Sequence, residues 1–75
     1  MIHDLPSDPD LDQLLTVVLA DTSGEGVTFR LPLGTEHAAT EALSDALAEH
    51  AAALGHHVGT GPIGPRQFIS QVQAP

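Results

Sequence analysis

Histidine and carboxylate side chains are the candidate metal ligands of this chain, because it contains no cysteine. His37 and Glu41 lie four residues apart, a spacing that lets both reach one ion from the surface of a helix. His50 and the His56–His57 pair follow near the end of the same segment, and with Glu49 they have the chemistry of a zinc or nickel site. No HExxH or other defined ligand spacing is present, so we predict helix-end and packing roles for the histidines, with no metal site and no cofactor.

Two short motifs resemble ligand-binding loops without meeting their requirements. Residues 59–64 match the GxGxxG pattern of dinucleotide-binding loops, but Pro62 interrupts it and the predicted helix precedes it. We therefore expect a proline-stiffened turn there. Asp8, Asp10 and Asp12 have the spacing of the first three ligands of a calcium loop, which also needs a glycine at its sixth position and a glutamate at its twelfth. The chain has neither residue in place, so the calcium-loop interpretation fails.

The sequence offers little for catalysis. It has no cysteine nucleophile, and Ser23 lies in TSGEG, which is not the GxSxG turn of serine hydrolases. Carboxylates and histidines are present, but no spacing places an acid and a base together. A domain of this size is also expected to have little depth for a pocket of about 300 Å³. We therefore predict that the protein is not an enzyme.

The charge balance of the chain is its most informative property. Ten acidic residues face only two basic ones, Arg30 and Arg66, which gives a formal charge of -8 over 75 residues. So few cations leave almost no counterion release to drive nucleic-acid binding, and nothing on such a surface attracts anionic lipid headgroups. We therefore expect neither a nucleic acid nor a membrane as a partner.

Three of the carboxylates, Glu41, Asp45 and Glu49, form a line that we call the acidic ridge. They are spaced four residues apart on a predicted helix, with no cation between them. Like charges at this spacing cost about 0.2–0.5 kcal/mol per pair in an isolated helix. The ridge is either a solvated face that keeps a small apolar protein soluble, or a docking surface for a basic patch on another protein. These three residues are the candidate partner-binding residues.

Two runs in the first half of the chain predict strands. Residues 13–20 are rich in β-branched and aliphatic side chains, and a turn-forming segment follows them. Residues 27–33 alternate between apolar and polar side chains, and Pro32 places their end at a sheet edge because proline cannot donate to a ladder. The two runs together predict a hairpin.

Helical periodicity predicts one helix over residues 35–54, which Gly55 is placed to end. Its expected apolar stripe comprises Ala39, Ala42, Leu43, Ala46, Leu47, Ala53 and Leu54. Residues 56–65 are rich in glycine and proline and predict a loop. Residues 66–73 fit either a strand or a short helix, and we favour the strand because it would complete the sheet beneath the helix.

These elements predict a small single α+β domain of order β-β-α-β, with a three-stranded, mostly antiparallel sheet and one helix packed on one face. Residues 1–12, with two prolines and four aspartates, predict a flexible acidic arm, and residues 13–75 form the domain. A chain this short, with no cysteine and with Phe29 and Phe68 as its aromatic residues, supports only a modest core, so we expect a homodimer or other homo-oligomer.

The predicted function is a small acidic protein–protein interaction module that binds another protein, one with a basic surface. We expect a cytoplasmic location, since the chain has neither an apolar run of about 20 residues nor a signal peptide. Two alternatives stay open. One is a metal- or pH-responsive regulator that uses His50, His56 and His57. The other is a structural subunit that lends the edge strand over 27–33 to an assembly.

Overall fold

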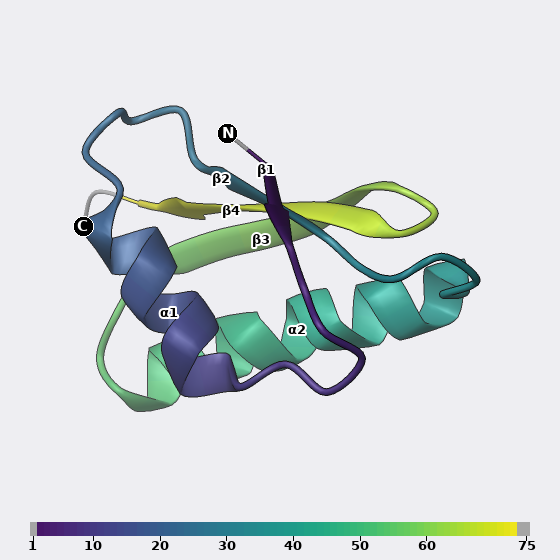
Figure 1. Ribbon diagram of the computed structural model, residues 1–75. Coiled ribbons are helices and arrows are strands. Elements are labelled where there is room, and N and C mark those ends of the chain that lie inside the picture. The colour runs from purple at the N-terminus through teal and green to yellow at the C-terminus, as the bar shows by residue number, and fades with distance from the viewer. Residues whose placement is uncertain (1, 74–75) are drawn as a thin grey trace.

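The computed structural model describes residues 2–73, which contain two helices and four strands. In chain order these are β1 (Ile2–Asp4), α1 (Leu11–Ala20), β2 (Val27–Arg30), α2 (His37–Ala53), β3 (Val58–Gly64) and β4 (Gln67–Val72). The strands form one sheet of order β1-β2-β4-β3, in which β1 is parallel to β2 and the other neighbours are antiparallel. Both helices lie on the same side of this sheet (Figure 1). The α+β class is confirmed, but the expected three strands and one helix become four strands and two helices.

The segment expected as the first strand, residues 13–20, is the larger part of helix α1. Asp10 caps the helix, since its Oδ1 accepts a hydrogen bond from Asp12 N at 3.0 Å. The buried side chains of α1 are Leu14, Leu15 and Val18. This spacing of three and four residues is that of one helix face. The β-branched residues cost the helix only a few tenths of a kcal/mol each, which the burial of Leu14, Leu15 and Val18 outweighs.

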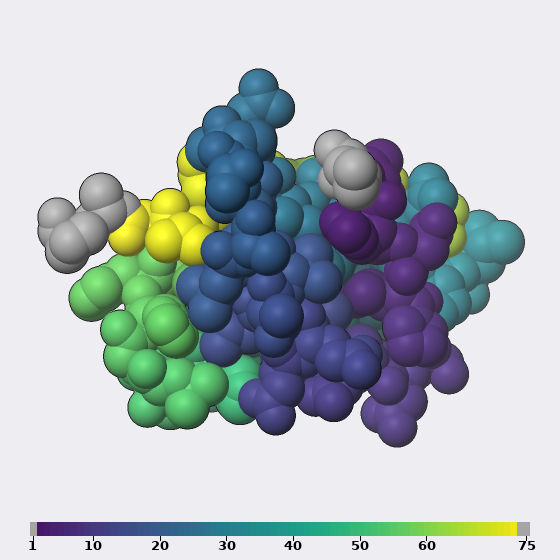
Figure 2. Space-filling view, turned by 60° about the vertical axis from the view of Figure 1, so that its left-hand side comes forward, coloured from purple at the N-terminus to yellow at the C-terminus, as the bar shows by residue number. Residues whose placement is uncertain are grey.

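The residues expected as a flexible arm belong to the fold over most of their described length. Ile2–Asp4 pair in parallel with β2, and Leu5 N donates to Arg30 O at 2.8 Å. Leu5 and Leu11 then pack against the core. Figure 2 shows the purple amino-terminal residues lying against the rest of the molecule. The expected boundary between residues 12 and 13 therefore falls inside α1.

β2 lies inside the sheet, between β1 and β4, and not at the edge where Pro32 was expected to place it. The strand ends at Arg30, so the proline follows it and removes no ladder hydrogen bond. The edges of the sheet are instead β1 and β3. The inward positions of β2 carry Val27 and Phe29, both buried as the alternation predicted.

The carboxyl-terminal segment confirms the strand that was favoured over residues 66–73. β4 pairs with β2 on one side and with β3 on the other. β3 is built from the glycine- and proline-rich residues that were expected to form a loop. Pro62 is tolerated because β3 is an edge strand, and a proline can stand there with its missing donor directed away from the neighbouring strand.

Helix α2 confirms the helix expected over residues 35–54, with a different face buried. Its buried residues are Thr40, Ser44, Leu47 and Ala51. The two hydroxyls are accommodated by hydrogen bonds: Thr40 Oγ1 donates to Pro65 O at 2.7 Å, and Ser44 Oγ lies 2.6 Å from Thr60 Oγ1. Most of the expected alanine stripe is consequently exposed or only half-buried. Within residues 2–73, no helix has the length and apolar character that crossing a bilayer requires.

The core lies between the sheet and the two helices. Phe29 of β2 and Phe68 of β4 face each other with ring centroids 5.2 Å apart. Leu47 of α2 and Val18 of α1 close over them, and all four side chains are almost fully buried. The core therefore holds α2 firmly against the sheet and fixes the direction in which its outer face points.

Candidate protein-binding surface

The acidic ridge is exposed along the outer part of α2, as the sequence predicted. Within residues 2–73 it has one ion pair, between His37 Nε2 and Glu41 Oε2 at 3.7 Å, and both side chains are more than half exposed. Such an exposed pair contributes roughly 0–1 kcal/mol. Asp45 and Glu49 have no ion-pair partner in the same range of residues. The ridge is therefore a line of negative charge that its own surroundings leave largely uncompensated.

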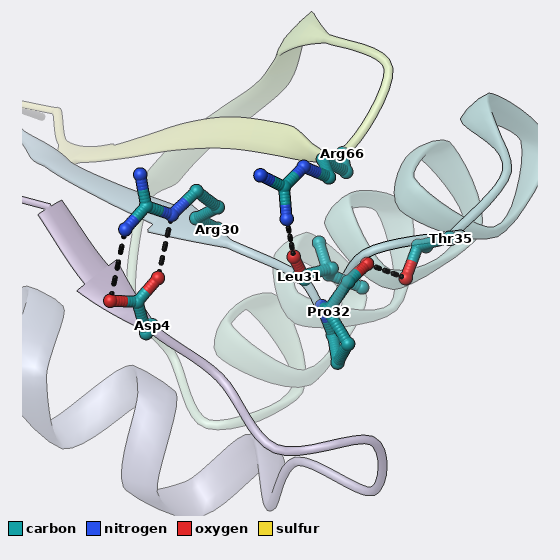
Figure 3. A network of polar contacts seen from close by, with 6 residues as sticks. All are labelled: Asp4, Arg30, Leu31, Pro32, Thr35 and Arg66. Atoms are coloured by element: carbon teal, nitrogen blue, oxygen red, sulfur yellow. Dashed lines mark hydrogen bonds and ion pairs between the residues drawn. The ribbon is translucent and has the colours of Figure 1, made fainter.

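Both arginines are occupied at the sheet (Figure 3). Arg30 binds Asp4 with two parallel contacts, Nε to Oδ1 at 2.6 Å and Nη2 to Oδ2 at 3.0 Å. This hydrogen bonding lowers the pKa of Asp4 from its ordinary value of 3.8 and raises the pKa of Arg30. Arg66 Nη1 donates to Leu31 O at 3.1 Å. These contacts join β1 to β2 and the start of β4 to the end of β2.

Two polar contacts fix the direction in which the ridge faces. His50 Nε2 lies 2.6 Å from Asp12 Oδ1, which marks the flank of α2 that faces α1. Ser44 contacts Thr60 of β3, which marks the part of α2 that faces the sheet. Successive residues of a helix are turned by 100°, so Glu41 and Asp45 lie on the flank of α2 that is turned away from α1, next to the side that carries Ser44. Glu49 lies further round the helix, on the side opposite the sheet. The first two carboxylates of the ridge are thus the ones nearest to β3.

β3 is the edge of the sheet above this flank. Gln73 N donates to His57 O at 2.8 Å, so residues 57 and 73 form a hydrogen-bonded pair. Such pairs alternate with non-bonded pairs along an antiparallel ladder, and the odd-numbered residues of β3 therefore bond to β4. The main-chain groups of Val58, Thr60 and Pro62 consequently point away from β4. No other segment within residues 2–73 pairs with this edge.

The histidines are dispersed and do not converge on a metal site. His50 is bonded to Asp12 of α1, His37 to Glu41, and His56 and His57 are exposed beyond the end of α2. Across residues 2–73, no three side chains of the metal-binding types gather closely enough to hold an ion. The cluster of His50 with its two later neighbours that the sequence allowed is absent from this part of the chain.

A hollow of about 460 Å³ opens near the end of α1, which is more room than a domain of this size was expected to offer. His3, Asp21, Ser23 and Glu25 are among its lining residues. Ser23 Oγ donates to Asp21 Oδ1 at 2.8 Å, and this bond is the main reason that the pKa of Asp21 is lowered. The Ser23 hydroxyl is thus directed at the Asp21 carboxylate beside this hollow.

The sequence predicted that the three ridge carboxylates lie on one exposed side of a helix, but it missed the strand edge near two of them. Its glycine and proline content hid the strand, although Val58, Thr60 and Pro62 at alternate positions between glycines were a period-two signal. No protein-family model, curated protein or solved structure gives a significant match to this chain.

Proposed function

We propose that this protein is a small acidic protein–protein interaction module, without catalytic activity of its own, which binds a basic surface of another protein through Glu41, Asp45 and Glu49. The observation that supports the proposal is the separation of charge. The three carboxylates stand exposed on a helix, while Arg30 and Arg66 are engaged at the sheet. A line of like charge that is largely uncompensated within residues 2–73 steers a cationic partner and repels acidic ones.

Charge reversal tests this proposal. The variant Asp45→Lys with Glu49→Lys removes the part of the ridge that has no ion pair, and Asp8→Lys with Glu25→Lys makes the same change in net charge elsewhere on the surface. The parent protein should capture a basic protein from a lysate of its native host, with an affinity that falls as salt rises. The ridge variant should lose this capture and the control should keep it. Equal capture by both variants contradicts the proposal.

The two alternatives from the sequence receive less support. A metal-responsive role needs histidines that share a site, whereas the contacts of His50 and His37 lead to different carboxylates. Lending residues 27–33 to another sheet does not fit a strand that already has β1 and β4 as neighbours. Unchanged melting temperatures on addition of zinc or nickel would agree with this ranking.

Self-association and a cytoplasmic location are part of the proposal. Large apolar side chains are exposed at Ile2, Leu19, Leu33, Leu54, Ile63 and Val72. Leu33 is the most exposed of them, at 85%. Sedimentation velocity over a wide range of protein concentrations measures whether these residues support a homodimer, and cell fractionation tests the location.

A further inference from the structure

We propose that the partner of this protein adds an extended, cationic segment as an antiparallel strand to the free edge of β3, and that its basic side chains contact Glu41 and Asp45. The inference rests on the proposed function, because it names the surface and the kind of segment that the acidic module binds. It goes further in making main-chain pairing, and not charge alone, the basis of recognition.

The edge of β3 is equipped for this pairing. Val58 and Thr60 each direct an N–H and a C=O away from β4, and Pro62 adds a further C=O. Edge strands are usually guarded against pairing by charged side chains, prolines or bulges. β3 carries no charged residue, and its proline and its irregularity at Pro62/Gly64 protect only the end of the strand. The half from Val58 to Thr60 is open to a partner strand.

The charge beside this edge selects the partner. In an antiparallel ladder, the residues that bond to Val58 and Thr60 have their side chains on the same side of the sheet as these two residues. That side is the one covered by α2, as the contact between Thr60 and Ser44 shows. Side chains of the added strand on this side extend toward the flank of α2 that carries Glu41 and Asp45. Lysine or arginine at alternate positions of the segment would therefore meet carboxylates.

A second copy of this chain is a poor occupant of the same edge. Pairing β3 with β3 of another copy would bring the two flanks of α2, each with its Glu41 and Asp45, toward each other. Like charges that meet across an interface oppose association. β3 itself contributes no cation to offset them. The occupant is accordingly a segment of a different, basic protein.

A synthetic peptide of about eight residues, in which lysine alternates with threonine, is the probe for this site. N-methylation of the lysine amides removes the donors that would face β3, while N-methylation of the threonine amides alters only the outer side of the added strand. Both peptides keep the same charge. Calorimetry should show binding of the unmodified and the threonine-methylated peptide, with affinity about tenfold lower or worse for the lysine-methylated one. Equal affinities of the two methylated peptides overturn the strand-addition inference.

Charge variants separate this inference from the proposed function. Glu41→Lys and Asp45→Lys, which alter the flank beside β3, should weaken the unmodified peptide more than Glu49→Lys, which alters the side opposite the sheet. Glu25→Lys, away from α2, is the matched control and should have little effect beyond that of net charge. If the ridge variants weaken binding but methylation of the lysine amides does not, the acidic module stands and strand addition fails. If no ridge variant weakens binding, both fail.

Amide hydrogen exchange supplies a direct readout at β3. In the free protein the amides of Val58 and Thr60 should exchange quickly, because they face away from β4, and those of Gly59 and Gly61 slowly. Saturating peptide should slow exchange at Val58 and Thr60 by about tenfold or more and leave the two glycines almost unchanged. Protection that appears on the ridge alone, with no change at these two amides, contradicts the inference.

Discussion

Ser70 has the one buried side-chain polar atom within residues 2–73 that lacks a hydrogen-bond partner. An unsatisfied buried hydroxyl costs about 1–3 kcal/mol, so Ser70→Ala should leave stability unchanged or raise it by up to about 1 kcal/mol. Ser44→Ala is the matched control. The Thr60 hydroxyl donates to Ser44 O, so Ser44 Oγ is the donor to Thr60 Oγ1, and its loss should cost about 1 kcal/mol. Urea unfolding measures both, and a clear loss of stability in Ser70→Ala would contradict this prediction.

Asp4 is the residue whose ionisation should matter most for acid stability, because its two contacts with Arg30 join β1 to the sheet. The hydrogen bond from Arg30 holds the pKa of Asp4 below 3.8 in the folded protein. A lowered folded-state pKa gives stability that is present above the unfolded value and is lost as the pH falls through the folded value. Asp4→Asn should therefore be less stable than the parent at pH 7, with the difference shrinking below about pH 4.

Thermal unfolding across this pH range checks the prediction for Asp4. Asp8→Asn is its control, since it removes a carboxylate that has no ion pair within residues 2–73. A difference between Asp4→Asn and the parent that stays constant down to the lowest pH would show that the Arg30 contact contributes nothing through ionisation.

At the scale of elements, α1 depends on its N-cap residue more than α2 does. Asp10 Oδ1 caps α1, whereas Glu36 stands at the same position of α2 without a side-chain cap bond. Asp10→Ala should cost about 1 kcal/mol, the usual effect of losing an N-cap. Glu36→Ala removes the same charge near a helix start without removing a cap, and should cost only a few tenths of a kcal/mol. Equal losses in denaturant unfolding would mean that charge, and not the cap, matters at Asp10.

The elements also show how far the sequence alone could lead. α2 and β2 were predicted because periodicity and propensity agree in them, whereas the strand at β4 was favoured because it completes the sheet. In α1 propensity and periodicity disagree. The run of valine and leucine favours a strand, whereas a helix is favoured by Asp10 as an N-cap and by the spacing of Leu11, Leu14, Leu15 and Val18. The helix forms because it buries these apolar side chains against the core. β3 could not be predicted from propensity, because its glycines gain order from pairing with β4 and from α2 beneath them.

On the scale of the whole molecule, the sequence could predict that the ridge residues share one side of a helix, but it could not predict that β3 lies next to two of them. Glu41, Asp45 and Glu49 share a side of any helix that contains them, so their spacing was sufficient. The presence of β3 beside Glu41 and Asp45 depends on the sheet order, in which β4 inserts between β2 and β3. A pairing between segments so far apart in the chain leaves no local signal in the sequence.

The net charge of -8 makes a prediction for the molecule as a whole. Excess charge of one sign destabilises the compact state by self-repulsion, and salt screens it over a distance of about 10 Å at 0.1 M. Salt also screens the attraction between Asp4 and Arg30, but with ten acidic and two basic residues most charge pairs in the chain are repulsive. The melting temperature at pH 7 should therefore rise between about 0.02 M and about 0.5 M NaCl, and the rise should largely vanish near the isoelectric point of about 4.6.

The ridge should supply much of this salt effect, because its carboxylates are neighbours on one helix and two of them, Asp45 and Glu49, have no ion-pair partner within residues 2–73. Asp45→Lys should accordingly raise the melting temperature at low salt and flatten its dependence on salt, since it places a cation between Glu41 and Glu49. Glu25→Lys, with the same change in net charge, should have a smaller effect. If both variants flatten the salt dependence equally, the repulsion is spread over the whole surface. The ridge would then contribute no more than other carboxylates to the repulsion that a cationic partner would reduce.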